Sequence, residues 1–166
     1  MHWTLNYFKN LDVYALFNWV CSNFLCFNAK KCKQMLVSRK RNQTSILPIK
    51  IGGDALEVVN EYRYLGIWIT SSLSWNRHVE EVCKRANRQV GVLYRRFYQN
   101  CSSRTLICLY IALVRPHLEY AVPVWDPHLN KNINSIERVQ RFALKVCTKS
   151  WGSSYDNLLS LTAWPT

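Results

Sequence analysis

Residues 61–97 read EYRYLGIWITSSLSWNRHVEEVCKRANRQVGVLYRRF, and residues 105–127 read TLICLYIALVRPHLEYAVPVWDP. Residues 62–69 are rich in aromatic and β-branched side chains, which predicts a strand. Beyond them, apolar residues recur every three or four positions, which predicts a helix that runs to about Phe97. The second stretch predicts a further helix, which Pro116 must kink or end. We therefore expect a boundary between a β-rich first part and a helical second part at residues 71–75.

The flanking sequence predicts further elements on both sides. An apolar stripe over residues 12–25 predicts a helix, and residues 131–148 predict the last helix. Ser74 or Asn76 is expected to cap the helix that ends near Phe97. Shorter elements are expected between residue 25 and the boundary: strands at 34–38, 46–51 and 56–59, a basic loop at 39–45 and a turn at 52–54.

The predicted fold class is α+β, with an N-terminal helix and a small antiparallel sheet followed by a helical bundle. Three segments are expected, residues 1–72, 73–150 and 151–166. Ile67, Trp68 and Ile69 are apolar on both faces of their predicted strand. Such a strand needs a covering layer above and below, so we expect part of the sheet to remain exposed and to favour self-association.

Composition narrows the class of partner. The chain has 166 residues, a net charge of +12 and 49% hydrophobic residues, with a pI of about 9.6. This balance favours a polyanion, nucleic acid first and an anionic membrane second, although a merely basic soluble protein would have the same composition. Residues 1–10 lack the pattern of a signal peptide, and no apolar run reaches the length of a membrane span. We expect an intracellular protein with no membrane partner, whose seven cysteines are free thiols.

Two groups of cations fall on helix faces that point away from the predicted core. At about 100° per residue, each group occupies one arc of its helix. The first group is Lys84, Arg85, Arg88, Arg95 and Arg96, and the second is Lys131, Arg138, Arg141, Lys145 and Lys149. Clustered cations with few interleaved acids predict contact with a nucleic-acid backbone. The alternative is that they only keep the helices soluble.

Candidate catalytic residues are missing from the pattern. Two-metal phosphoryl transfer needs carboxylates that can bridge a pair of ions, but Glu80 and Glu81 are the only adjacent acids and would point about 100° apart on a helix. No FxDD, YxDD, GxSxG or P-loop sequence occurs, and the four histidines lack HxxxH spacing. No catalytic or metal-binding residue is therefore assigned.

Six segments in one order resemble the reverse transcriptases of non-LTR (LINE-type, jockey-like) retrotransposons. Residues 16–41 are similar to the pattern WxxxNxLxxNxxKCKxMxxSRKR, which includes Lys31 and Lys33. The other segments are YRYLGIWI, LSWNRHVEEVCKRA, GVLYRRF, LVRPHLEYAVPVWDP and IERVQRFALKVCTKSW. The resemblance covers residues 12–165.

The resemblance implies roles for these segments. Lys31 and Lys33 would lie near nucleotide phosphates at the end of a polymerase palm, and Tyr64, Leu65 and Gly66 would form the hairpin behind the primer terminus. The two cationic groups would hold an RNA/DNA template–primer duplex from a helical thumb. The parent enzyme would use Mg²⁺, but its catalytic motif has no counterpart here, so we expect an inactive, truncated or decayed copy with an accidental start at Met1 and no bound cofactor. Alternatives are a stand-alone nucleic-acid-binding or protein-interaction module and a non-functional product.

Overall fold

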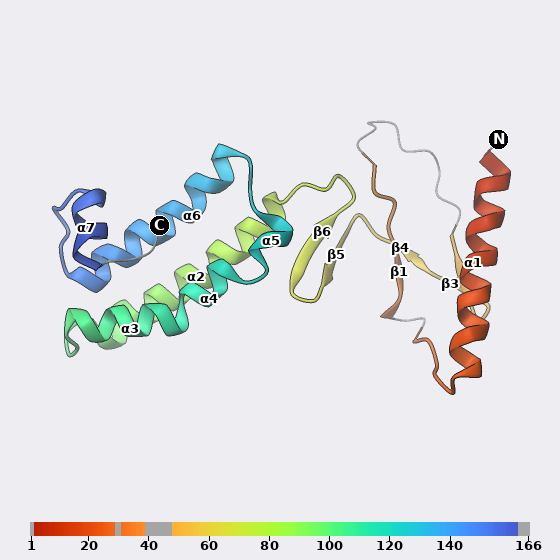
Figure 1. Ribbon diagram of the computed structural model, residues 1–166, viewed down its shortest axis with the longest axis horizontal. Helices are drawn as coiled ribbons and strands as arrows, with labels where there is room; N and C mark the ends of the chain where they lie inside the picture. The colour runs from red at the N-terminus through yellow and green to blue at the C-terminus, as the bar shows by residue number, and fades with distance from the viewer. Residues whose placement is uncertain (1, 29–30, 39–47, 163–166) are drawn as a thin grey trace. The chain divides into compact units, whose positions relative to one another are not determined.

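A computed structural model describes the backbone of residues 2–28, 31–38 and 48–162, and the side chains of residues 12–28, 31–38 and 48–160. The chain divides into two compact units, Met1–Ser74 and Trp75–Thr166, which are described one at a time (Figure 1). Helices and short strands occur together, so the predicted α+β class is confirmed. The predicted loop at residues 39–45 and the start of the predicted strand 46–51 lie outside the described residues.

The first unit opens with α1 (His2–Ser22), which begins well before the predicted residue 12. No glycine or proline occurs in residues 2–22 to prevent the helix from extending in this direction. At the other end, Ser22 Oγ and Asn23 Nδ2 each donate a hydrogen bond of 2.8 Å to the Trp19 carbonyl, and Phe24 adopts a φ of 57°. A left-handed residue of this kind ends a helix, so the predicted end at residue 25 is wrong.

The predicted apolar stripe of α1 is also largely wrong. Val20 is buried, but Leu16, Cys21 and Leu25 are exposed and Phe24 is 98% exposed. The helix contacts β2 (Lys50–Ile51). Two-residue strands present too little surface to cover one side of a 21-residue helix, and apolar periodicity alone does not reveal this.

In the described part of the first unit, the strands form three separate pairs in place of one antiparallel sheet. β1 (Lys33–Gln34) runs parallel to β4 (Glu57–Val58), and β2 is antiparallel to β3 (Asp54–Ala55). The predicted strands 34–38 and 56–59 are thus too long. Gly52 and Gly53 have φ angles of 61° and 95°, which L side chains rarely adopt, and they form the predicted turn between β2 and β3.

Residues 62–69 form a hairpin and not the single strand that their composition predicts. β5 (Glu61–Tyr64) pairs antiparallel with β6 (Ile67–Thr70), and Tyr64 lies opposite Ile67. Leu65 and Gly66 make the turn with φ angles of 47° and 88°. Two consecutive positive φ angles match the turn that suits the right-handed twist of paired strands. Of the three apolar residues for which we expected incomplete cover, Ile67 is buried while Trp68 and Ile69 are half-buried.

As far as residue 162, all regular structure of the second unit is helical. It contains α2 (Asn76–Phe97), α3 (Ser103–Leu113), α4 (Arg115–Glu119), α5 (Val122–Trp125), α6 (Asn130–Thr148) and α7 (Tyr155–Thr162). Helix α6 packs against α2, α3 and α7, and α4 packs against α2 and α3. Figure 1 shows α2 and α6 side by side, with the N-terminal ends of both near α5.

One core holds these helices together. Its largest fully buried side chains include Leu93 from α2, Leu106 and Tyr110 from α3, Trp125 from α5 and Val146 from α6. Burying a large apolar side chain stabilises a fold by about 1.5–3 kcal/mol. The apolar positions predicted for α2 and α6 largely occupy this core, although Ile133 and Tyr94 are exposed.

The helix ends follow local hydrogen bonding. Ser102 Oγ accepts a hydrogen bond of 3.2 Å from the Thr105 amide and so caps α3. The predicted cap of α2 is wrong: Trp75 occupies the position before Asn76 and provides no side-chain cap. Ser74 instead donates its amide to Thr70 Oγ1 at 2.9 Å, in the turn that precedes α2.

One stretch, Ser103–Trp125, is long and apolar enough to span a membrane by length and composition, with a mean hydropathy of 1.3. The stretch comprises α3, α4 and α5, and Ala121 interrupts it with a φ of 54°. It contributes buried residues such as Leu118 to the core and exposes others such as Ile111. A core helix of a soluble protein can meet the same criteria, so this finding is weak evidence for a span.

Candidate nucleic-acid interface

The cations of α2 lie on the side of the helix opposite its buried face. Val79, Ala86, Val90 and Leu93 are buried against the core, and the helix period places the cations on the other side. We call this set, Lys84, Arg85, Arg88, Arg95 and Arg96, the cationic arc. All of its members except the half-buried Arg85 are exposed.

Arg85 differs from the rest of the arc because it is engaged locally. Its Nε donates to Glu81 Oε1 at 3.2 Å, one helical turn away. This hydrogen bond, and the positive charge of Arg85, lower the pKa of Glu81. A pair of this kind contributes only about 0.3–0.5 kcal/mol, but it reduces the attraction of Arg85 for a phosphate.

The second predicted group does not form one stripe of equivalent side chains. Arg141 lies over the ring of Tyr155, with 4.8 Å from Cζ to the ring centroid. Lys149, which follows α6, lies over the ring of Tyr98 at 5.3 Å. Lys145 is half-buried, and Lys131 and Arg138 are exposed. Two members therefore lie over aromatic rings and two line a groove, while Lys145 does neither.

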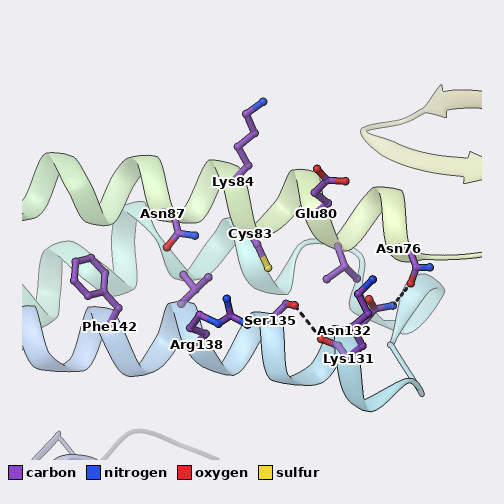
Figure 2. A pocket seen from close by; sticks show the side chains of 12 residues that line it. Asn76, Glu80, Cys83, Lys84, Asn87, Lys131, Asn132, Ser135, Arg138 and Phe142 are labelled. Carbon is purple, nitrogen blue, oxygen red and sulfur yellow. Dashed lines mark hydrogen bonds between the residues drawn. The ribbon is translucent and has the colours of Figure 1, made fainter.

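That groove runs between α2 and α6 and has a volume of about 810 Å³. Figure 2 shows Cys83 and Asn76 of α2 on the side toward α6, whereas Lys84 and Glu80 extend from α2 at the outer edge of the groove. The lining residues are Asn76, Val79, Glu80, Cys83, Lys84 and Asn87 from α2, and Lys131, Asn132, Ser135, Arg138, Val139 and Phe142 from α6. The structure thus brings Lys84 together with Lys131 and Arg138, which the sequence predicts on two separate faces.

A polar contact joins the two helices at one end of the groove. Asn132 Nδ2 donates a hydrogen bond of 2.9 Å to Asn76 Oδ1 (Figure 2). Asn132 is only 5% exposed, although the sequence predicts an apolar face for this side of α6. In the sequence, this contact is signalled by the amide of Asn132, which interrupts the predicted apolar face of the helix. A buried polar side chain needs a hydrogen-bonding partner.

The thiol of Cys83 lies in the wall of the same groove. Burial raises the pKa of Cys83, and the nearby positive charge of Arg138 opposes that effect without cancelling it. The thiolate is the reactive form of cysteine. Cys83 is therefore protonated near neutral pH and is a poor candidate for a nucleophile.

Lys31 and Lys33 belong to the first unit. Lys33 Nζ forms an ion pair with Glu57, the residue opposite it in the β1–β4 pair, so its charge is partly neutralised locally. Lys31 is exposed, and its carbonyl accepts a hydrogen bond of 3.3 Å from the Tyr62 hydroxyl. A role for either lysine in binding phosphate stays a prediction.

The predicted primer hairpin corresponds to the tip of the β5–β6 hairpin. Tyr64 is exposed, and Leu65 is 71% exposed. An apolar side chain at a left-handed position gains nothing from burial here and costs about 1–2 kcal/mol in backbone strain. Strain of this kind is often retained for a contact with something else. Self-association through the exposed apolar face of residues 62–69 stays a prediction.

No group of three His, Cys, Asp or Glu residues that could hold a metal ion occurs among the described residues. Comparisons with protein-family models, with curated proteins and with solved structures gave no match.

Proposed function

We propose that the chain is the part of a non-LTR RNA-directed DNA polymerase that follows the catalytic strands, and that its second unit holds a template–primer duplex by the phosphate backbone. Two features support this proposal. Six sequence segments follow the order found in that family, and the YLG segment lies at a hairpin tip. The observation that carries it is the cationic arc, whose exposed members project from the outer side of α2.

The chemistry of the arc suits backbone contacts. Guanidinium groups donate hydrogen bonds in a planar fork that matches phosphate oxygens, and three of the four exposed arc members are arginines. Contacts to phosphates position a protein on a duplex but carry no sequence information directly. Binding should therefore be sequence-tolerant, with an affinity of order 10⁻⁴–10⁻⁶ M at physiological salt.

The proposal is tested by removing the exposed arginines of the arc. The triple variant Arg88→Gln, Arg95→Gln, Arg96→Gln should bind an RNA–DNA hybrid more weakly than the wild-type chain. The slope of log affinity against log salt should flatten by up to ~3 units, about one for each lost phosphate contact. Fluorescence anisotropy of a labelled hybrid between 50 and 300 mM KCl, about the range over which such contacts lose affinity, measures both quantities.

A matched control removes three exposed cations from other surfaces: Lys50→Gln, Arg63→Gln and Arg104→Gln. Both triple variants have the same net charge. If the arc is the interface, the control keeps most of the affinity and salt slope. Equal losses in the two variants would mean that total charge and not the arc determines binding, and would refute the proposal.

A further inference from the structure

A group of partly exposed aromatic rings lies at the C-terminal ends of α2 and α6. We call it the aromatic cluster: Tyr94, Tyr98, Phe142 and Trp151. Trp151 is 47% exposed, Tyr94 44% and Phe142 39%. Large aromatic side chains stabilise a fold most when they are fully buried, so several exposed together indicate a binding surface.

The rings are held in fixed positions. Trp151 Nε1 donates a hydrogen bond of 3.0 Å to the Tyr98 hydroxyl. The Trp151 ring meets Tyr94 at 83° and Phe142 at 60°, each with 6.2 Å between centroids. Neither Tyr94 nor Phe142 stacks parallel to the Trp151 indole ring. A planar ligand would stack parallel to the indole, and these two contacts do not use that geometry.

A cation lies beside these rings. Lys149 adopts a φ of 59° where α6 ends, and its Nζ lies 5.3 Å from the centroid of the Tyr98 ring. The cluster therefore combines exposed π faces with a positive charge. This combination suits a ligand with planar rings and negative charge.

The cluster continues into the groove between α2 and α6 through Phe142, which belongs to both (Figure 2). Lys84, Lys131 and Arg138 line the groove, and Glu80 is the acid among its described lining residues. From Asn76 to Tyr94 the path measures about 27 Å along the helix axis. A cationic path of this length with an aromatic end matches a short polyanionic strand.

We propose that the groove and the aromatic cluster bind single-stranded nucleic acid, with an unpaired base stacked on Trp151 and the sugar–phosphate backbone along Lys84, Lys131 and Arg138. Unpaired bases stack on aromatic side chains, whereas bases within a duplex are already stacked on each other. Cationic tracks with aromatic platforms bind single strands with little sequence preference. Arg88, Arg95 and Arg96 do not line this groove, although Lys84 belongs both to the groove and to the cationic arc, so the surface extends the duplex-binding proposal.

The test uses the whole chain and fluorescein-labelled 12-nucleotide strands of oligo-dT and oligo-rU, measured by anisotropy. Trp151→Ala should weaken binding about tenfold, which is within the range for loss of one base–aromatic stack, and should leave the salt slope unchanged. Trp151→Phe should recover most of the affinity because a flat ring remains. Trp19→Ala, at another exposed tryptophan, should have no effect.

Two further arms separate stacking from charge and from folding. An abasic 12-mer has the same phosphates, so wild-type and Trp151→Ala chains should bind it equally. Tyr94→Ala, on a different element, should also weaken oligo-dT binding, with an unchanged circular dichroism spectrum. The proposal is overturned if Trp151→Ala binds oligo-dT as tightly as the wild type. It is also overturned if the wild-type chain binds the abasic strand with the same affinity as oligo-dT. A third contrary result is that Trp151→Ala changes only the concentration-dependent self-association of the chain and not its affinity for oligo-dT.

The outcomes for the two proposed surfaces are distinguishable. In the variant that lacks Arg88, Arg95 and Arg96, adding Trp151→Ala should still weaken oligo-dT binding about tenfold, even if hybrid binding is lost. Trp151→Ala alone should keep hybrid binding with its salt slope. If the test of one proposed surface fails, the test of the other surface still stands.

Discussion

Asn132 Nδ2 donates a hydrogen bond of 2.9 Å to Asn76 Oδ1, which joins the first turn of α6 to the first turn of α2 across 56 residues of chain. Asn132 is buried and Asn76 is exposed. Near this contact the two helices form the end of the groove, so their separation there depends on a polar side chain within an otherwise apolar interface.

Asn132→Ala should lower the free energy of unfolding by about 1 kcal/mol, the usual net contribution of one hydrogen bond. Asn134→Ala is the matched control, because Asn134 is on the same helix but exposed. The two substitutions change helix propensity equally, so the difference between their urea midpoints isolates the contact. Equal midpoints would show that the contact contributes nothing.

The turn of the β5–β6 hairpin provides a stabilising substitution. Leu65 has a φ of 47° and is largely exposed. Leu65→Asn would place Asn-Gly in this turn, the pair that best tolerates two positive φ angles. We expect slower hydrogen exchange of the backbone amides in β5 and β6, equivalent to about 1 kcal/mol of added local stability.

Gly66→Ala is the opposing change, because alanine is strained at a φ of 88°. It should accelerate exchange in the same amides. If Leu65→Asn accelerated exchange instead, the Leu65 side chain would have to make a stabilising contact that outweighs the strain.

The helical unit was more predictable from sequence than the first unit, for a physical reason. The predicted apolar positions of α2 are largely buried because that face of the helix packs against a core formed with the other helices. Phe24 and Leu25 belong to an equally regular stripe, yet the short strand pairs leave them exposed. Periodicity reports which face of a helix is apolar, but not whether another element covers it.

Turns and tertiary pairs were harder to predict. Leu65 is not a turn residue by propensity, so composition alone predicts one strand here, with Gly66 as the only local turn signal; the hairpin was implied only by the resemblance. The groove depends on the packing of α2 against α6, which are far apart in sequence. The pairing of Trp151 with Tyr98 also depends on that packing, and α7 packs against α6; no local motif encodes either contact.

Thiol reactivity should follow burial. Cys21, Cys26 and Cys108 are exposed, whereas Cys83 and Cys147 are buried. Burial raises the pKa of Cys147 to about 12, so its thiolate fraction near pH 8 is very small. Alkylation with N-ethylmaleimide, followed by peptide mass spectrometry, should label the exposed three within minutes and Cys147 only after addition of urea. Labelling of Cys147 in the folded chain at the rate of Cys108 would contradict the packing of α6 against α3.

The same thiol should make stability depend on alkaline pH. In an unfolded chain a cysteine titrates near pH 8.5, but burial raises the pKa of Cys147 to about 12 in the folded protein. Between these values the unfolded chain releases the proton first, so the folded state loses stability as pH rises. The contribution is complete below about pH 8.5 and declines at up to about 1.4 kcal/mol per pH unit above it.

Cys147→Ala isolates this effect from the other groups that titrate at alkaline pH. The variant should be less stable than the wild type at pH 7, because it loses the buried sulfur and its hydrogen bond of 3.5 Å to the Leu106 carbonyl. The difference in unfolding free energy between Cys147→Ala and the wild type should become smaller as urea midpoints are measured at pH 9, 10 and 11. Cys108→Ala, at an exposed thiol, should track the wild type throughout. If the difference in stability between Cys147→Ala and the wild type stays constant from pH 7 to 11, the thiol has the same pKa in the folded and unfolded states. Cys147 would then not be buried in the helical core.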